Sequence, residues 1–318
     1  MPRPDFPKTL PQFAARFATE DACFLYIIAS RWPDGFKCSR CGHTEAYGRK
    51  DRRAVQCKQC DKVYSATAGT VMHRSRQPLC NWLWAAYLVA VDKRGISAVQ
   101  LQDQLGTRFY DVSFNMLHKL RAAMVNPERT PLRGIVEADE TYIGGPEPGG
   151  QGKGGKAIVV GAVEVRDSGP GRLRLRLVLS ANRGPILKFI KDTVAPGSTV
   201  ITDAAQVYES LGREGYRHEL QTTASGDPQD TVLPHLHLAF SNLKTWLRGT
   251  HHGRVSKKHL QAYLNEFVFR YNRRGNLQAA FQTLLGLTTK VEGPTYRGLY
   301  EGTFRHPNPA LAGRGHKG

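Results

Sequence analysis

The sequence predicts an α/β protein in which two small N-terminal segments precede a larger domain built around a sheet. Two Cys-x-x-Cys pairs stand near the N-terminus, and stretches of helical periodicity follow them. From Gly134 onward the pattern changes to alternating or continuous apolar strands, with a helix between the third strand and the fourth. A sheet of this order starts antiparallel and gains a parallel strand after the crossover helix.

The charge of the chain limits the classes of partner. Its 318 residues are enough for two or three domains. Lysine and arginine number 45 against 27 aspartates and glutamates, and the net charge of +18 favours a polyanion, above all double-stranded DNA. No apolar run reaches the length of a membrane span. We therefore expect no membrane partner and a cytoplasmic, reducing location, associated with the nucleoid when DNA is bound.

Four cysteines form the first motif, within residues 1–77. Cys38 and Cys41 make one pair and Cys57 and Cys60 the other, with fifteen residues between the pairs. This spacing is typical of a structural site in which four thiolates surround Zn²⁺. A ribbon this small cannot fold on core burial alone, so we expect metal binding to supply its folding free energy.

A helical segment over residues 78–128 comes next. Apolar residues recur there at helical spacing in three stretches, and Ser97 is placed to cap the second helix. The glycine-containing turn "LGTR" separates that helix from a longer one that ends in Lys119 and Arg121. This order is typical of a helix-turn-helix that binds DNA. A plain three-helix connector would give a similar pattern.

The third segment, residues 129–290, carries the sheet. We expect strands in 134–145, 157–167 and 171–181, a helix in 184–194, a buried strand running into a helix in 198–208, and a short strand in 215–220. This is the order of a ribonuclease-H-like fold. Gly150–Lys156 matches the G-x-x-x-x-G-K pattern of nucleotide-binding loops, but Ala157 follows and opens a strand, so a basic hairpin loop is the better interpretation.

Two aspartates are candidates for catalysis. Asp139 lies in the first predicted strand, and Asp203 stands at the C-terminal end of the strand after the crossover helix. If these strands are neighbours, both carboxylates emerge on the same side and can hold two divalent cations, Mg²⁺ or Mn²⁺, for phosphodiester chemistry. Glu137 shares the face of Asp139, whereas alternation turns Glu140 to the opposite face.

Several motifs occur in an order that resembles a known family. The strings "VEADETYIGG" and "ITDAAQVY", the segment 240–274 and the four-cysteine ribbon together look like the zinc-ribbon-bearing ISXO-like insertion-sequence transposases of the DDE superfamily. The resemblance covers roughly residues 15 to 275. It implies a prokaryotic enzyme that binds the terminal inverted repeats of its own element. Such an enzyme cuts DNA with an aspartate-bound metal pair and transfers the 3′-hydroxyl end, as a homo-oligomer in a synaptic complex.

The third catalytic position is less certain than the first two. Residues 231–265 contain no Asp or Glu, where the family commonly places a Glu followed after six residues by Lys. The resemblance aligns Lys244 with that lysine and His237, 34 residues after Asp203, with the glutamate. An imidazole ligates Mn²⁺ better than Mg²⁺, and it can alternatively act as a general base. Asn242 is the competing candidate, because its amide oxygen can bind a metal.

A last helix carries residues that the resemblance links to the family. Ser256 is placed to cap it, and Glu266, Arg270 and Arg273 fall at i, i+4 and i+7 on one face. They either shape the active site or hold the substrate backbone, as the resemblance implies, or form an i,i+4 ion pair worth about 0.3 to 0.5 kcal/mol. Residues 291–318 are expected to form a basic, disordered tail.

These observations favour a DNA transposase that catalyses metal-dependent strand cleavage and strand transfer. One alternative is a zinc-ribbon regulator or inactive element copy, which would bind duplex DNA without metal-dependent nicking. A second alternative is a structure-selective nuclease of the same fold, which would cut without rejoining ends.

Overall fold

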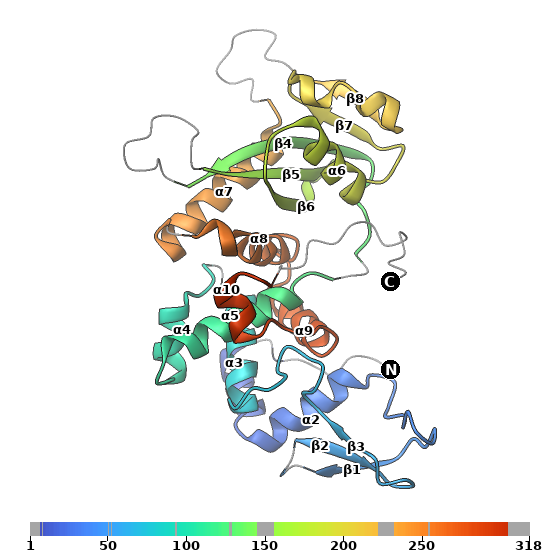
Figure 1. Ribbon diagram of the computed structural model, residues 1–318, viewed down its shortest axis with the longest axis vertical. Coiled ribbons are helices and arrows are strands. Elements are labelled where there is room, and N and C mark those ends of the chain that lie inside the picture. The colour runs from blue at the N-terminus through green and yellow to red at the C-terminus, as the bar shows by residue number, and fades with distance from the viewer. Residues whose placement is uncertain are drawn as a thin grey trace. The chain divides into compact units, whose positions relative to one another are not determined.

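The computed structural model describes residues 7, 9–49, 51, 53–92, 94–126, 129–144, 156–221, 232–253 and 255–304. These residues form two compact units (Figure 1). The first contains the described residues within Met1–Met124 and Arg273–Arg305, and the second those within Val125–Asn272. Most of the expected hairpin loop, residues 145–155, and the tail from residue 305 onward lie outside the described residues.

The first unit opens with two helices and a small antiparallel sheet of three strands in the order β1-β2-β3. These elements are α1 (Leu10–Arg16), α2 (Glu20–Arg31), β1 (Ala46–Arg49), β2 (Ala54–Cys57) and β3 (Val63–Ser65). The hydroxyls of Thr9 and Thr19 cap the two helices by accepting backbone N–H groups of the first turn.

Three further helices match the segment predicted to be helical. They are α3 (Leu79–Val91), α4 (Ala98–Leu105) and α5 (Tyr110–Ala123). Ser97 caps α4 as predicted, because its hydroxyl accepts the backbone N–H of Gln100 at 3.2 Å. Gly106 ends α4 at φ +61°, a left-handed conformation that costs glycine little.

Two C-terminal helices complete the first unit and correct the predicted domain boundaries. They are α9 (Leu277–Thr288), assigned beforehand to the sheet domain, and α10 (Tyr296–Glu301), assigned to the disordered tail. α9 packs on α3 and α5, and its Phe281 is fully buried beside Phe13 and Tyr87. The apolar surface of α1 and α3 therefore needs a segment distant in sequence to cover it, which local periodicity cannot reveal.

The second unit contains a five-stranded sheet in the order β6-β5-β4-β7-β8. Its strands are β4 (Ile135–Ile143), β5 (Ala157–Arg166), β6 (Gly169–Val178), β7 (Thr199–Thr202) and β8 (Arg217–Leu220). β4, β5 and β6 pair antiparallel, β7 pairs with β4 in parallel, and β8 pairs with β7 in parallel. The predicted change from antiparallel to parallel pairing after the crossover helix is confirmed.

The helix predicted directly after β7 is absent from the described residues. Two short 3-10 helices replace it, η2 (Gln206–Tyr208) and η3 (Leu211–Glu214). Asp203 closes a turn there, because its Oδ1 accepts the backbone N–H of Ala205 at 3.2 Å. Gly212 and Gly215, the second at φ +88°, disfavour a longer helix.

Helices cover both faces of this sheet (Figure 1). α6 (Arg183–Thr193) packs on one face, over a core that includes Val136, Ala138 and Tyr208. α7 (Pro234–His251) and α8 (Lys257–Tyr271) pack on the other, over a core that includes Leu236 and Phe240. Ser256 caps α8 as predicted, accepting the N–H of Lys258 at 3.3 Å.

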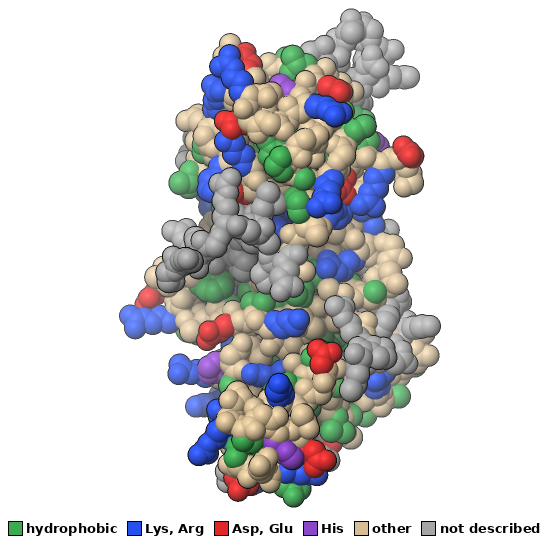
Figure 2. All heavy atoms as spheres, turned by 90° about the vertical axis from the view of Figure 1, so that its right-hand side faces the viewer, with side chains coloured by type: hydrophobic (Ala, Val, Ile, Leu, Met, Phe, Trp, Pro, Cys, Tyr) green, Lys and Arg blue, Asp and Glu red, His purple; other side chains and the backbone are tan. Residues whose placement is uncertain are grey.

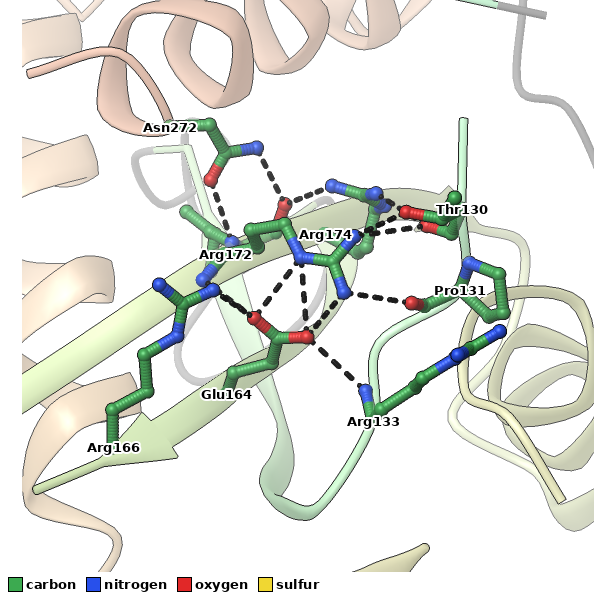
Figure 3. A network of polar contacts seen from close by, with 9 residues as sticks. Thr130, Pro131, Arg133, Glu164, Arg166, Arg172, Arg174 and Asn272 are labelled. Atoms are coloured by element: carbon green, nitrogen blue, oxygen red, sulfur yellow. Dashed lines mark hydrogen bonds and ion pairs between the residues drawn. The ribbon is translucent and has the colours of Figure 1, made fainter. Parts of the chain in front are cut away.

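The arginines of the alternating strand β6 point into the unit. Arg174 and Arg176 are 6% and 7% exposed, and Arg176 pairs with Asp192 of α6 at 2.8 Å. Arg172 donates to Glu164 of β5 and to the carbonyl oxygen of Pro131, as Figure 3 shows. Arg172 therefore holds the segment that leads into β4. The charges of Arg174 and Arg176 face little solvent.

Candidate functional site

Four sulfur atoms converge in the first unit. The Sγ atoms of Cys38, Cys41, Cys57 and Cys60 all lie within 4.8 Å of one another. Cys38 is 3.5 Å from Cys60, and Cys41 is 3.6 Å from Cys57. Thiolates bound tetrahedrally at about 2.3 Å from a zinc ion would lie about 3.8 Å apart. The donor set and its spacing therefore fit a structural Zn²⁺.

The backbone around each cysteine pair explains this convergence. Gly42 and Asp61, which follow the second cysteine of each pair, have φ values of +76° and +56°. Their N–H groups donate to the carbonyl oxygens of Cys38 at 2.9 Å and Cys57 at 3.2 Å. Each turn curls back on itself, so both of its cysteines point to the same centre.

The two candidate aspartates belong to neighbouring strands, Asp139 within β4 and Asp203 directly after β7. β4 and β7 pair in parallel, with Glu137 opposite Ile201. Asp139 follows Glu137 by two residues and Asp203 follows Ile201 by two, so the aspartates stand at the same level of the sheet. Burial raises the pKa of Asp139, and the charge of Asp203 raises it further. The prediction that these two strands are neighbours is confirmed.

α7 brings His237 to the same place. Its Nε2 lies 3.0 Å from Oδ2 of Asp139. The other oxygen of that carboxylate, Oδ1, accepts the backbone N–H of Glu140 at 2.7 Å. The Asp139 side chain is 14% exposed and the imidazole 44%. The pair is therefore held by the fold and still open to solvent.

Asn242 and Lys244 occupy different faces of α7. With 3.6 residues per turn, Lys244 lies about 20° around the helix from His237, and Asn242 lies about 140° away. Asn242 is exposed. Lys244 is partly exposed and has no hydrogen-bond or ion-pair partner among the described residues. The helix thus directs His237, and not Asn242, to Asp139, and Lys244 shares the face of His237.

Asp203 is near this pair without closing a tight cluster around it. Within the described ranges, the four cysteines form the only group of three or more potential ligands that converge on one point. The Asp203 carboxylate instead accepts the N–H of Ala205. The site consists of a close pair, Asp139 and His237, with a second carboxylate beside it.

The two glutamates that flank Asp139 face opposite sides of the sheet, as predicted. Oε2 of Glu137 accepts the backbone N–H of Leu236 in α7 at 2.7 Å. Oε2 of Glu140 accepts the hydroxyl of Tyr208 at 3.0 Å on the other face. Burial raises the pKa of Tyr208, and the Glu140 carboxylate adds to this shift. Glu137 is therefore the glutamate that touches the helix carrying His237.

Two known families match the chain at these features. An ISXO2-like transposase domain matches residues 131–272, and a transposase zinc-ribbon domain matches residues 18–63. The chain is therefore similar to ISXO2-like transposases over residues 131–272. It is also similar to an uncharacterized protein in transposable element ISH50 of Halobacterium salinarum. The two are 27% identical over 298 residues, which cover 85% of this chain and 98% of that protein. The resemblance noted in the sequence is confirmed.

The i,i+4 ion pair expected in the last helix is present and buried. Glu266 is fully buried, Arg270 is 9% exposed, and their charged groups lie 3.5 Å apart. The guanidinium of Arg270 stacks over the ring of Trp246 at 5.6 Å. Arg273 lies beyond Tyr271, the last residue of α8, so it does not share the helical face predicted for it.

The helical segment of the first unit differs from the predicted helix-turn-helix in which end of α5 is accessible to solvent. Arg121 is 1% exposed, and the Lys119 ammonium donates to the carbonyl oxygen of His73 at 2.9 Å. The basic end that suggested DNA contact therefore lies inside the unit. The exposed end is the N-terminal one, where Arg108, Phe109 and Tyr110 face solvent.

Two residues that position the site were missed from the sequence. Gly161 of β5 lies opposite Asp139, and a Cβ there would stand 2.7 Å from the ring of Phe240 in α7. A glycine inside the apolar run "AIVVGAVEV" is a recognisable signal of close approach. Gln221, whose Oε1 accepts the N–H of Leu233 at 3.2 Å, carried no signal.

The surface of the protein carries charge of both signs. Figure 2 shows Lys and Arg side chains distributed along the face in view, interleaved with acidic ones. The described helices include none with the length and apolar character of a membrane span.

Proposed function

We propose that this transposase binds the terminal inverted repeats of its insertion sequence, cuts the DNA strand there and transfers it to a target. The observation that carries the proposal is the contact between Asp139 and His237, 3.0 Å apart, beside Asp203 at the end of the adjacent parallel strand. In a chain similar to transposases, a carboxylate pair on neighbouring parallel strands supports phosphodiester chemistry.

The sheet supports assignment to the ribonuclease-H-like fold. Three antiparallel strands, a crossover helix and two parallel strands give the order β6-β5-β4-β7-β8. In this arrangement the first strand lies at the centre of the sheet, next to the first strand after the crossover. The fold thereby gathers Asp139 and Asp203 although 63 residues separate them in the sequence.

The donor set fits divalent cations of the Mg²⁺ or Mn²⁺ type. Neighbouring ligands of an octahedral ion bound at about 2.1 Å lie about 3.0 Å apart, which is the separation of Asp139 Oδ2 and His237 Nε2. The mutual repulsion of Asp139 and Asp203 favours a cation between them. Asp139, Asp203 and His237 are the side chains that would hold such cations. When bound, such ions activate the attacking oxygen and stabilise the leaving oxygen.

The polar face of α7 supplies contacts for the substrate backbone. His237, Lys244 and Arg248 recur at i, i+7 and i+11, so they lie along one side of the helix. Lys244 and Arg248 have no hydrogen-bond or ion-pair partner among the described residues, and their charges are free to meet phosphates. Lys244 is the candidate to hold the strand next to the cleaved bond.

The first unit supplies DNA recognition in this proposal. The zinc ribbon and the exposed N-terminal end of α5 are the candidate contacts, since the first residues of a recognition helix reach base edges in helix-turn-helix proteins. Arg108 and Tyr110 replace Lys119 and Arg121 as the residues expected to touch DNA. Two ends must be cut for one element to move, so we also propose a homo-oligomer in the synaptic complex.

Alanine variants of the aspartates test the proposal. Asp139→Ala and Asp203→Ala should each abolish Mn²⁺-dependent cleavage and transfer of end DNA, because the cations lose a charged ligand, while duplex binding persists. Asp167→Ala, at an exposed turn of the same unit, is the matched control and should behave as the parent. Cleavage and joining are followed on labelled inverted-repeat DNA. Strand transfer retained by either variant would contradict the assignment.

The same assay separates the alternative functions. A regulator or an inactive copy would bind the repeats and leave them uncut in Mg²⁺ and Mn²⁺. A structure-selective nuclease would cut without producing joined ends. Joined products that depend on both aspartates distinguish the transposase from both.

A second comparison tests the third ligand. His237→Ala should lose activity and His237→Glu should keep or improve it in Mg²⁺, because a carboxylate suits this ion better than an imidazole. Asn242→Ala is the control and should retain activity, since its side chain points away from Asp139. An inactive Asn242→Ala beside an active His237→Ala would reverse the assignment.

A further inference from the structure

The helix that carries His237 begins without a cap of its own. Leu233, the residue before it, is fully buried and has φ +50°, a left-handed conformation that leucine rarely adopts. No side chain of the turn itself accepts a hydrogen bond from the first turn of α7. Pro234 has no N–H, but those of the next residues need acceptors when buried. The acceptors must therefore come from elsewhere in the fold.

Glu137 of β4 supplies an acceptor. Its Oε2 accepts the N–H of Leu236 at 2.7 Å. The side chain is buried, with 3% of the residue exposed. A carboxylate is well suited to this place, because the N-terminus of a helix carries partial positive charge. Glu137 thus caps α7 from the neighbouring sheet.

Gln221, which directly follows β8, holds the same turn and is bonded to the strand that precedes Asp203. The side-chain Oε1 of Gln221 accepts the backbone N–H of Leu233 at 3.2 Å. The backbone N–H of Gln221 donates to the carbonyl oxygen of Thr202 at 2.9 Å. Thr202 is the residue immediately before Asp203. The start of α7 is therefore bonded to β4 close to Asp139 and, through Gln221, to the end of β7.

We propose that Glu137 is a positioning residue of the transposase site, and that Gln221 assists it. Together they seat the first turn of α7 so that His237 meets Asp139. His237 directly follows Leu236, whose N–H Glu137 binds, so any movement of this turn displaces the imidazole. The hydrogen bond that Glu137 accepts comes from α7, which distinguishes its task from that of a metal ligand. The consequence for catalysis rests on the proposed function.

Hydrogen exchange and cleavage test this role together. In the full chain without DNA, Glu137→Ala should speed amide exchange in residues 235–237 about tenfold, because the buried acceptor is lost. In Mn²⁺, single-turnover cleavage of inverted-repeat DNA should fall about tenfold or more. Glu137→Gln keeps an acceptor oxygen and should recover most of both losses. Glu219→Ala, an exposed glutamate of β8, is the matched control and should change neither.

Two results would overturn the proposal. One is unchanged exchange in Glu137→Ala, which would mean that no cap forms. The other is faster exchange with unchanged cleavage, which would mean that the cap does not position the site. If Glu137→Ala does not fold, Gln221→Ala gives the same test through the milder loss of one neutral bond. If the parent cuts no DNA, the proposed function fails, and the exchange rates still decide whether Glu137 holds the turn.

Discussion

Replacing Gly161 by alanine tests how the site is assembled. Gly161 pairs with Asp139 across β4 and β5, on the face that α7 covers. The added Cβ would stand 2.7 and 2.8 Å from two ring carbons of Phe240 and 3.0 Å from a methyl carbon of Leu236. Both side chains belong to α7, one turn apart. Alanine can fit only if α7 moves away from the sheet or if these side chains leave their places.

The size of the effect follows from these distances. Carbon atoms in contact prefer about 3.5 to 4.0 Å, so the helix or the ring must yield by about 0.8 Å or more. Overpacking of this kind costs about 1–3 kcal/mol. For a unit of this size it should lower the Tm by about 2–12 °C. A shift of about 1 Å would also open the 3.0 Å contact between His237 and Asp139 and slow cleavage up to about a hundredfold.

Calorimetry measures the change in Tm. Single-turnover cleavage of inverted-repeat DNA in Mn²⁺ measures the change in rate. Gly184→Ala is the matched control, because an added Cβ meets nothing within 4 Å at that position of α6. Adding Phe240→Leu to Gly161→Ala removes the clashing ring carbons and should recover part of the lost rate. If Gly161→Ala melts and cuts like the parent, α7 does not approach β5 as described, and the reasoning is refuted.

Two further predictions concern stability. Removing zinc with a chelator, or replacing Cys57 by serine, should unfold the ribbon strands β1 to β3, because metal binding supplies their folding free energy; native-like NMR shifts of these strands in the metal-free protein would contradict this. Glu164 makes a contribution to the free energy of unfolding that depends on pH in the acid range. Burial alone would raise its pKa, but hydrogen bonds from Arg172 and Arg166 outweigh burial and hold the pKa at about 2. Because this is below the unfolded value, the stabilisation is complete above pH 4.5 and is lost as pH falls from 4.5 towards 2, to a total of about 3 kcal/mol. Urea unfolding of Glu164→Gln across this range should show a correspondingly weaker pH dependence than the parent.

Local patterns were sufficient for the elements that carry the chemistry. The spacing of the cysteine pairs predicts that four sulfurs meet, because a Cys-x-x-Cys turn directs both side chains to one point whatever surrounds it. Alternation along β4 separates the faces of Glu137 and Glu140, because side chains on a strand point to opposite sides in turn. The order of strands and crossover helix likewise restricts which strands can be neighbours.

These local patterns could not predict which helices and strands pack against one another. The helical period of α9 indicates an apolar face, but it does not say that this face covers α3 and not the sheet. The same limit applies to Lys119 and Arg121, which look accessible in a helical pattern and are enclosed by the first unit. Glu266 and Arg270 show the correct i,i+4 spacing, yet burial by the rest of the unit makes them a different kind of pair.

By itself, the sequence determined the resemblance to transposases, the four cysteines that meet, the α/β order and the two aspartates as candidates, since each depends on residues close together in the chain or on motifs in order. The tertiary structure decided which side chain of α7 reaches Asp139. Whether His237 or Asn242 reaches Asp139 depends on how α7, whose His237 lies 98 residues after Asp139, is rotated and placed against the sheet. The close contact of α7 with Gly161 and the hydrogen bonds of Glu137 and Gln221 set this placement. Contacts between distant segments leave little trace in local periodicity, because each segment alone is compatible with many partners.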